Sequence, residues 1–321
     1  MSAQGRQKVV LLLNLGGPAT LADIRPFLVS LFSDRDIIRL PGGGLLQRPL
    51  ARLIAWRRAP KVAPRYAAIG GGSPILGFTL AQARALESRS GCRCLVGMRY
   101  SAPTIEEALR GAAEREPEEV IALPLFPHYS RATTGSVFRE LDRAWVRLGL
   151  SLKVRRVESY PDHPGYLAAL AETIEEALEN FTPRERPKVR LIFSAHSLPV
   201  SFIGEGDPYV SHLERTIRGL ERLTELPPWQ LAFQSRSGPV RWLEPATGLA
   251  LEKLLAEGFR HLVMVPISFV SDHLETLYEM DMLYAGQARA AGAKLVRSAA
   301  LNERPKFIAA LAELVEAAAS R

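Results

Sequence analysis

The chain has 321 residues, of which 47% are hydrophobic and 23% are charged, and an excess of Lys and Arg over Asp and Glu gives it a formal net charge of +7. This composition is typical of a folded globular protein and excludes disordered, fibrous and collagen-like classes. The length accommodates two domains of roughly 150 residues each. Lys and Arg are scattered among Glu along most helical stretches, so we expect no nucleic-acid partner.

Neither a membrane-spanning helix nor a signal peptide is predicted near the start of the chain. The longest apolar run there covers residues 9–13, far short of the roughly 18 residues that a spanning helix requires, and it has the length of a strand. Cys92 and Cys94 are the only cysteines and do not complete a structural zinc site or hold an iron–sulfur cluster. We therefore expect a reduced, cytoplasmic protein.

Short aliphatic runs alternate with longer amphipathic segments along the chain, a pattern typical of βαβ units and a parallel sheet. The runs predict strands at residues 8–14, 94–98, 120–124, 152–157, 189–194, 230–234 and 261–266. Helices are predicted between them at residues 104–114, 165–180, 207–223 and 247–257, and also in the 20s and the 80s. These elements favour the α/β class.

Two stretches of the chain match each other without a gap, which predicts two similar halves. In each stretch a proline, Pro103 or Pro245, precedes a helical segment rich in Leu, Glu and Ala, and a strand then ends at Pro124 or Pro266 with the same spacing. The strands that open the two halves also align, but the first half is longer between Pro18 and Pro103. We place an insertion there, at residues 40–77.

The inserted segment combines an apolar and a basic face at helical spacing. Its apolar residues are Leu45, Leu46, Leu50, Leu53 and Trp56, and its basic residues include Arg48, Arg52, Arg57 and Arg58. Such a segment can lie on an anionic membrane surface or line a pocket for a flat, apolar, acidic ligand. A helix packed on the core with a solvated basic face fits the pattern equally well.

Three loops that follow predicted strands carry polar groups, and ligands bind at such loops in α/β sheets. His196, one or two residues beyond a strand, can accept a proton near neutral pH. Glu275 and Glu279 are four residues apart and, with Asp272, form a line of carboxylates that suits protons or a hard cation. A solvated acidic helical turn has the same pattern. Phosphate-binding glycine motifs and the Gly-x-Ser-x-Gly elbow are absent from the sequence.

Six motifs, in order along nearly the whole chain, resemble those of the ferrochelatase family. They are Asn14-Leu15-Gly16-Gly17-Pro18, Gly71-Gly72-Ser73-Pro74-Ile75, Gly97-Met98-Arg99-Tyr100, Ser194-Ala195-His196-Ser197-Leu198-Pro199, Gln234-Ser235 with Gly238-Pro239 and Trp242-Leu243, and the segment 271–281. The resemblance implies two similar Rossmann-type domains, each with a parallel four-stranded sheet, and a porphyrin cleft between them. We expect the N-terminal half at residues 1–155 and the C-terminal half at 156–321, with the insertion as a lip over the pocket that touches the membrane.

The resemblance also implies a reaction, the insertion of Fe²⁺ into a porphyrin with loss of two pyrrole protons, which is the last step of haem biosynthesis. It implies that His196 and Glu275 act in catalysis and bind the metal, facing each other across the slot that receives the porphyrin. Asp272, His273 and Glu279 then belong to a path for protons or metal. The residues expected to contact the porphyrin are Arg99, Tyr100, Tyr129, Ser130 and Trp242.

Departures from the family narrow these expectations. The chain ends without the Cys-rich tail that holds an iron–sulfur cluster in mitochondrial members, so we expect no cluster, no tightly bound cofactor and a monomer. Residues 31–36 and 71–75 resemble the branch that uses protoporphyrin, so protoporphyrin IX and Fe²⁺ are the expected substrates, with peripheral contact at the inner face of the membrane. The alternatives are a coproporphyrin ferrochelatase, a cobalt chelatase and a non-catalytic haem or porphyrin carrier.

Overall fold

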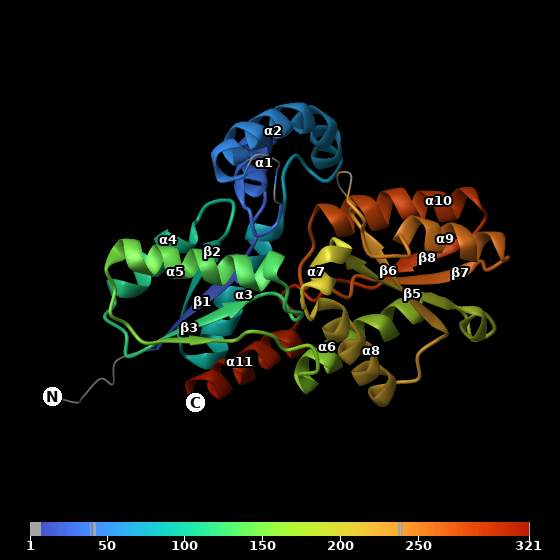
Figure 1. The fold of residues 1–321 in the computed structure, drawn as a ribbon. Helices are drawn as coiled ribbons and strands as arrows, with labels where there is room; N and C mark the ends of the chain where they lie inside the picture. Colours follow the sequence, from blue (N-terminus) through green and yellow to red (C-terminus); the bar gives the residue numbers. More distant parts are fainter. Residues whose placement is uncertain (1–7, 39, 41–42, 237, 239, 321) are drawn as a thin grey trace. The chain divides into compact units, whose positions relative to one another are not determined.

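A computed structural model describes residues 8–38, 40, 43–236, 238 and 240–320. Figure 1 follows the chain through two compact units. One unit runs to Tyr160 and also takes in the residues from Phe307 onward, and the other is Pro161–Lys306. The division along the sequence therefore falls five residues beyond the expected boundary, and the last helix belongs with the first unit and not with the second half of the chain.

The first unit is built on a parallel four-stranded sheet with the strand order β2-β1-β3-β4. Its strands are β1 (Val9–Asn14), β2 (Arg93–Met98), β3 (Val120–Pro124) and β4 (Val154–Arg156). Its helices are η1 (Leu21–Asp23), α1 (Ile24–Ser33), α2 (Gly43–Ala68), α3 (Ile75–Ser90), α4 (Ile105–Ala113), the π-helical η2 (Arg131–Gly135), α5 (Ser136–Leu148) and α11 (Pro305–Ala319). Strand β1 is central and buried along its whole length, as an aliphatic run in a parallel sheet requires.

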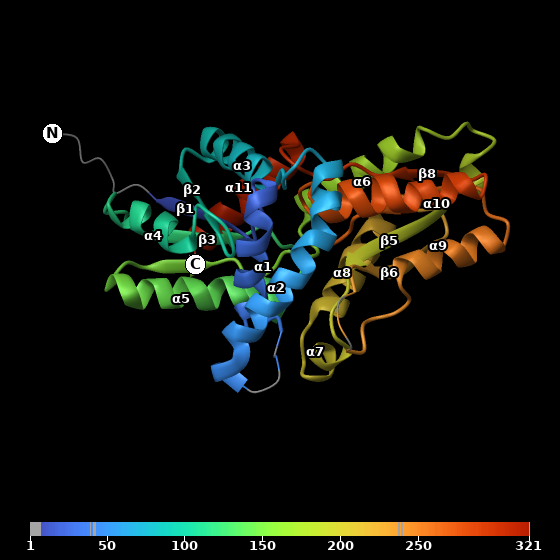
Figure 2. The ribbon, with the colours of Figure 1, turned by 90° about the horizontal axis from the view of Figure 1, so that it is seen from above.

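The second unit has the same sheet order, β6-β5-β7-β8. Its strands are β5 (Arg190–His196), β6 (Trp229–Gln234), β7 (His261–Val265) and β8 (Lys294–Arg297). Its helices are α6 (Pro164–Leu178), η3 (Arg186–Lys188), α7 (Val200–Gly204), α8 (Tyr209–Leu223), α9 (Thr247–Ala256), the π-helical η4 (Glu275–Tyr284) and α10 (Ala285–Ala290). Both sheets are covered on two faces, by α4 and α5 against α3 and α11 in the first unit, and by α9 and α10 against α6 and α8 in the second (Figures 1 and 2).

The predicted repeat is confirmed by the identical order of the two sheets. Equivalent backbone bonds tie its prolines to the sheets: the N–H of Met98 donates to the carbonyl of Pro103 at 2.7 Å, and that of Phe233 to the carbonyl of Pro245 at 2.9 Å. Between the first two strands of each half, the first unit has α1, α2 and α3 while the second has only α7 and α8. Helix α2 lies within the predicted insertion and across α1.

Each unit has its own hydrophobic core. Leu11, Leu109 and Leu141 join β1, α4 and α5 in the first unit. Ile192 and Leu251 do the same for β5 and α9 in the second. Burial of each such side chain stabilises the fold by about 1.5–3 kcal/mol. The cores fix the helices against the sheets and so fix the strand ends from which the loops extend.

Strand β8 was not predicted from the sequence. Lys294–Arg297 is only four residues long and lies at the edge of its sheet, with three residues only partly buried. A short edge strand lacks the continuous apolar run that identifies central strands, so periodicity does not detect it.

Candidate functional site

The carboxyl ends of all four strands in the second unit lead into polar groups. His196 ends β5, Gln234 ends β6 and Arg297 ends β8, while helix η4 begins shortly after β7. Because the strands are parallel, these ends meet at one edge of the sheet, where ligands bind in α/β proteins. This edge is the candidate site.

His196 and Glu275 form the centre of the site. Nδ1 of His196 lies 2.9 Å from Oε2 of Glu275, and the two side chains are 39% and 20% exposed. The backbone N–H of His196 donates to Oγ of Ser268 at 3.0 Å, and its carbonyl oxygen accepts from the hydroxyl of Tyr209 at 3.0 Å. Three contacts thus set the position of His196, and part of its ring stays open to solvent.

The direct contact between these two groups corrects one expectation. The imidazole and the carboxylate were expected to face each other across a slot for a planar ligand. A hydrogen bond of 2.9 Å leaves no space for a macrocycle between them. The two groups therefore belong to the same wall of the site.

Glu275 and Glu279 lie on a π-helix, η4, where the sequence indicated an ordinary helical turn. The π-helix is rare and often marks a functional site. Oε2 of Glu279 accepts from Oγ of Ser235 at 2.8 Å and from Nε2 of Gln234 at 3.2 Å. The same Nε2 also lies 3.2 Å from the carbonyl oxygen of Glu275, to which it donates. Residues at the end of β6 therefore hold the first turn of η4.

The charges of the central pair stabilise each other. Burial alone would lower the pKa of His196, but the charge and hydrogen bond of Glu275, together with the charge of Glu279, outweigh it and raise that pKa above its usual value. Burial would raise the pKa of Glu275, and the neighbouring His196, followed by His273, lowers it instead. Glu275 is therefore ionised throughout the neutral range.

His273 presents one ring nitrogen to the central pair. Its Nδ1 lies 3.1 Å from the carbonyl oxygen of Ser271, to which it donates, and its Nε2 lies 3.9 Å from Oε2 of Glu275. Burial outweighs the nearby acidic groups and lowers the pKa of His273, so the ring is neutral near pH 7. The ring of Phe269 packs against both imidazoles, with centroids 4.5 Å from His273 and 6.4 Å from His196.

Asp272 does not extend this group. Its carboxylate accepts from Oγ1 of Thr276 at 2.9 Å and from Nδ2 of Asn302 at 2.9 Å, and it forms an ion pair with Arg297 at 3.0 Å. The structure thus brings His196, His273, Glu275 and Glu279 together and directs the Asp272 carboxylate toward β8.

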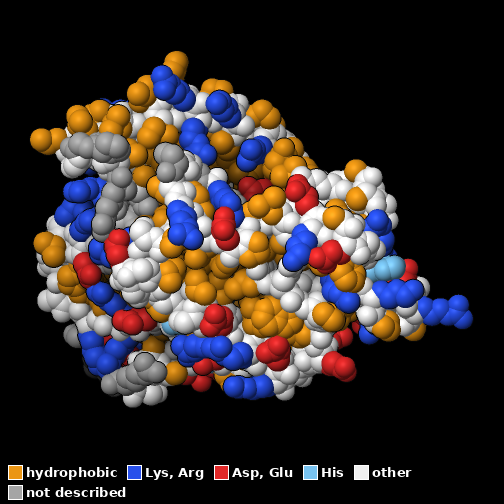
Figure 3. All heavy atoms as spheres, turned by 45° about the vertical axis from the view of Figure 1, so that its right-hand side comes forward, with side chains coloured by type: hydrophobic (Ala, Val, Ile, Leu, Met, Phe, Trp, Pro, Cys, Tyr) orange, Lys and Arg blue, Asp and Glu red, His pale blue; other side chains and the backbone are white. Residues whose placement is uncertain are grey.

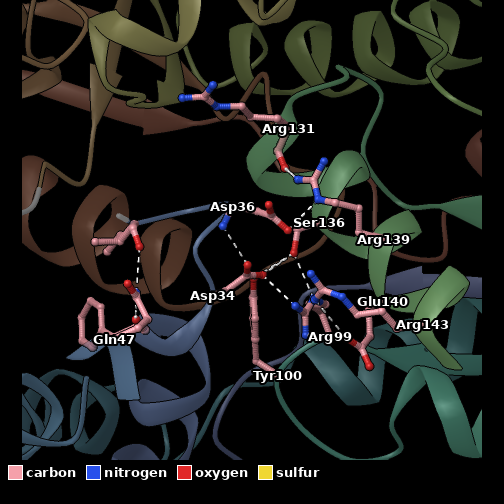
Figure 4. A network of polar contacts seen from close by, with 12 residues as sticks. Asp34, Asp36, Gln47, Arg99, Tyr100, Arg131, Ser136, Arg139, Glu140 and Arg143 are labelled. Carbon is pink, nitrogen blue, oxygen red and sulfur yellow. Dashed lines mark hydrogen bonds and ion pairs between the residues drawn. The ribbon is translucent and has the colours of Figure 1, made fainter. Parts of the chain in front are cut away.

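Arg99 and Tyr100, two expected porphyrin contacts, belong to a buried network in the first unit (Figure 4). Asp34 accepts from Nη2 of Arg99 at 2.8 Å, from the hydroxyl of Tyr100 at 2.7 Å and from Oγ of Ser136 at 2.5 Å. Arg99 also lies 3.6 Å from Glu140, and its side chain is only 12% exposed. Burial would raise the pKa of Asp34, but these donors lower it. The observed contacts of both side chains are with this network.

The other expected porphyrin contacts lie in different surroundings. Ser130 is buried, and its Oγ accepts from the N–H of Ala132 at 3.2 Å to cap η2. Tyr129 is partly exposed beside it. Trp242, in the second unit, is partly exposed and donates from Nε1 to the carbonyl of Gly238 at 3.4 Å.

The apolar lip residues lie on α2 and reach solvent. Leu45 is 92% exposed and Trp56 is 57% exposed, while Leu46 and Leu53 are also exposed and Leu50 is partly buried. Figure 3 has apolar and basic side chains side by side at the top of the molecule, where α2 lies in Figure 1. Among the helices of the described residues, none has both the length and the apolar character to cross a membrane.

Four residues that contact the central groups were not predicted as site residues. Gln234 and Ser235 belong to a motif that was noted for its resemblance, and a polar pair directly after a strand is the signal that could have singled them out. Tyr209 and Ser268 hold the backbone of His196 from a helix and a loop. Nothing in their local pattern distinguishes them from other polar residues.

Comparison with known proteins assigns the fold. The solved structure of SirB from Bacillus subtilis with Fe³⁺ has a TM-score of 0.59 and 12% identity, covering 98% of this chain and 96% of its own. A sirohydrochlorin chelatase SirB in complex with cobalt has a TM-score of 0.55 at 12% identity, covering 98% and 96% of the two chains. The two-unit chelatase fold is thereby confirmed.

Comparison by sequence assigns the family. The ferrochelatase family model matches residues 7–319. The ferrochelatase of Geotalea daltonii is 51% identical over 96% of each chain. That of Geobacter metallireducens is 52% identical over 96% of this chain and 98% of its own, and that of Synechocystis is 46% identical over 95% and 81%. This chain belongs to the ferrochelatase family, enzymes that insert iron into a porphyrin to make haem.

Proposed function

We propose that this chain joins Fe²⁺ and protoporphyrin IX, with His196 taking up the pyrrole protons and Glu275 acting beside it at the metal. The observation that carries the proposal is the hydrogen-bonded pair of His196 and Glu275, partly open to solvent at the carboxyl edge of the sheet. Family membership supports the reaction class.

His196 is suited to accept protons at Nε2. In the neutral ring Nδ1–H donates to Glu275, which leaves the Nε2 lone pair available. The negative charge of Glu275 raises the pKa of the imidazole and makes Nε2 a stronger base. Each iron that enters a porphyrin displaces two protons, so the imidazole must be loaded and unloaded twice. The protons can leave to solvent through the exposed part of the His196 ring.

The same groups suit a metal that is in transit. An imidazole nitrogen and a carboxylate oxygen are ligands that Fe²⁺ accepts. A site with few protein ligands leaves coordination positions open, which lets the ion pass on to the porphyrin. His273 Nε2, 3.9 Å from Oε2 of Glu275, and the Glu279 carboxylate extend the path on the protein side. The hydrogen bond from Nδ1 of His273 to Ser271 is the kind that orients an imidazole ligand.

An anaerobic assay tests the activity directly. Purified protein with Fe²⁺ and protoporphyrin should produce the Soret band of the metalloporphyrin, and failure to produce it overturns the proposal. His196→Ala should abolish turnover while porphyrin binding, followed by fluorescence, persists. Loss of binding along with turnover would assign His196 to porphyrin binding instead of proton transfer.

Two comparisons separate the alternatives. A carrier that only binds porphyrin has no turnover to lose, so iron insertion that is sensitive to Glu275→Ala excludes it. Rates with coproporphyrin against protoporphyrin, and with Co²⁺ against Fe²⁺, decide which substrates are preferred. Faster insertion into coproporphyrin would overturn the assignment of protoporphyrin.

We also propose that α2 contacts an anionic membrane surface. Leu45 and Trp56 are exposed on the same helix as Arg48 and Arg52. These two arginines line a pocket of about 550 Å³ and form no ion pair with any residue that the structure describes. The acids that share the pocket are already paired, Asp34 and Glu140 with Arg99, and Asp36 with Arg139. The positive charges of Arg48 and Arg52 are therefore available to bind lipid phosphates.

Vesicle flotation tests the membrane contact. The double variant Leu45→Ser, Trp56→Ser should lose binding to vesicles that contain phosphatidylglycerol, and Arg48→Glu with Arg52→Glu should do the same. A control replaces Leu249 and Leu223, which are 58% and 55% exposed in the second unit, with serine. Equal binding by all variants would refute the contact.

The remaining expectations concern the state of the protein. We propose a cytoplasmic monomer without a resident cofactor or iron–sulfur cluster. Light scattering should give the mass of one chain, and metal analysis of the purified protein should find no stoichiometric bound iron. A stable dimer or an absorbing cluster would contradict these expectations.

A further inference from the structure

Arg297, the last residue of β8, binds two carboxylates that flank Glu275 in the sequence. Its Nη1 lies 3.0 Å from Oδ1 of Asp272, and its Nε and Nη2 donate to the two carboxylate oxygens of Asp281 at 2.7 and 2.9 Å. The side chains of Arg297 and Asp272 are both nearly buried. One guanidinium thus connects the loop before η4 to the middle of that helix.

Asp272 transmits this contact to the start of η4. Besides Arg297, its carboxylate accepts from Oγ1 of Thr276 and from Nδ2 of Asn302, each at 2.9 Å. Thr276 is fully buried, and its Oγ1 in turn accepts from the N–H of His273 at 3.0 Å. The backbone on both sides of Glu275 is therefore tied to Asp272.

The second contact of Arg297 is with Asp281, which lies two residues beyond Glu279 on η4. A π-helix is a rare and poorly favoured backbone form, so surrounding groups must hold it in place. The Ser235 and Gln234 contacts hold one side of η4 at Glu275 and Glu279. Arg297 holds the helix through Asp272 and Asp281, the residues that bracket these two glutamates.

We propose that Arg297 is a positioning residue for metal insertion: by clamping Asp272 and Asp281 it keeps η4 in the register that presents Glu275 to His196. The inference rests on the proposed role of Glu275 at the metal. Arg297 touches neither His196 nor Glu275 in the contacts of the described residues, so it acts through the helix. Groups that orient metal ligands typically change metal affinity by roughly 10- to 100-fold when removed.

The test compares Arg297 with an arginine that has a similar set of partners away from η4. Arg304 lies 3.3 Å from Glu172 and binds both carboxylate oxygens of Glu176, which are residues of α6. Arg297→Gln and Arg304→Gln each remove a cation from two acids in the second unit. Arg297→Lys keeps the charge but cannot form the two-pronged contact with Asp281.

Three quantities are measured on each full-length variant: KM for Co²⁺ with porphyrin saturating, KM for porphyrin with Co²⁺ saturating, and the affinity for Co²⁺ alone by calorimetric titration. Arg297→Gln should raise the Co²⁺ KM and weaken Co²⁺ binding by roughly tenfold or more with the porphyrin KM unchanged. Arg297→Lys should fall between this variant and the unmodified protein. Arg304→Gln should lower only the melting temperature.

The proposal fails if Arg297→Gln leaves the Co²⁺ values unchanged, or if Arg304→Gln changes them equally. Should Arg297→Gln not fold, Asp281→Asn and Arg297→Lys give the same comparison, because each removes the two-pronged contact between residues 297 and 281 and keeps a partner for Asp272. The Glu275→Gln variant separates the metal role of Glu275 from the positioning role of Arg297. If it abolishes Co²⁺ binding while Arg297→Gln does not weaken it, the metal role of Glu275 stands and only the clamp is refuted. If Glu275→Gln leaves Co²⁺ binding intact, the metal role itself is refuted.

Discussion

Nδ1 of His196 and Oε2 of Glu275 lie 2.9 Å apart although 79 residues separate the two positions along the chain. One group ends β5 and the other begins the π-helix that follows β7, and the parallel pairing of these two strands brings them together. Their contact couples the basicity of the imidazole to the charge of the carboxylate.

This coupling predicts a lower pKa of His196 in the Glu275→Gln variant. Proton uptake requires the neutral imidazole, so kcat/KM of the unmodified protein falls as pH drops below the pKa of His196. The carboxylate raises that pKa above the usual value near 6.5. Glu275→Gln removes a proposed metal ligand along with the charge, so the pKa is followed by NMR titration of the imidazole, which needs no turnover. The titration midpoint should move to lower pH in Glu275→Gln and, by less, in Glu279→Gln, and an unmoved midpoint in both variants would contradict the coupling.

A second prediction concerns stability as a function of pH. A pKa that is raised in the folded protein stabilises the fold fully below the unfolded value near 6.5, and this stabilisation fades as pH rises through the folded pKa. His196→Gln removes it. The loss of melting temperature caused by this substitution should therefore be greater at about pH 5.5 than at about pH 9. A loss that grows toward alkaline pH would mean that the folded pKa is not raised.

The buried network around Asp34 predicts a large loss of stability in the first unit. Asp34→Ala removes the acceptor of three side-chain donors and leaves the buried Arg99 charge with one carboxylate, Glu140, at the longer distance of 3.6 Å. Breaking a buried ion pair costs about 3–5 kcal/mol. The control is Asp142→Ala, which removes an exposed partner of Arg156 and should cost at most about 1 kcal/mol in urea unfolding. Similar costs for both variants would show that burial does not matter here.

A further prediction concerns Gly72, where the structure leaves no room for a larger side chain. A Cβ at this position would lie 2.0 Å from the carbonyl oxygen of Ala19, and a backbone atom cannot turn aside as a side chain does. Gly72→Ala should therefore destabilise the protein by about 1–3 kcal/mol, as other overpacked substitutions do. Gly77→Ala is the matched control, because nothing lies within 4 Å of its added Cβ and alanine favours helix α3. It should leave the melting temperature unchanged or raise it.

The sequence predicted the elements whose signal is local. Strand β3 was placed at its observed bounds because four consecutive apolar residues end at a proline, and the equal spacing of Pro103 and Pro245 from the strands that follow revealed the repeat. His196 and Glu275 were chosen through family motifs, and their direct contact depends on packing over 79 residues. The π-helix was missed because it differs from an α-helix in its backbone hydrogen bonds, i to i+5 in place of i to i+4, and a segment this short carries no side-chain pattern that tells the two apart. Asp34 joins partners up to 102 residues away, which no local pattern encodes.

Helix α11 is translated last but belongs to the first unit, which affects how the newly made chain can fold. The second unit is complete in sequence at Lys306, while the first still awaits the residues from Phe307 onward, including Phe307 and Leu311, which are fully buried. A ribosome therefore delivers everything needed for the second unit before it delivers the last piece of the first. The first unit therefore cannot complete its core until the whole of the second unit has been translated.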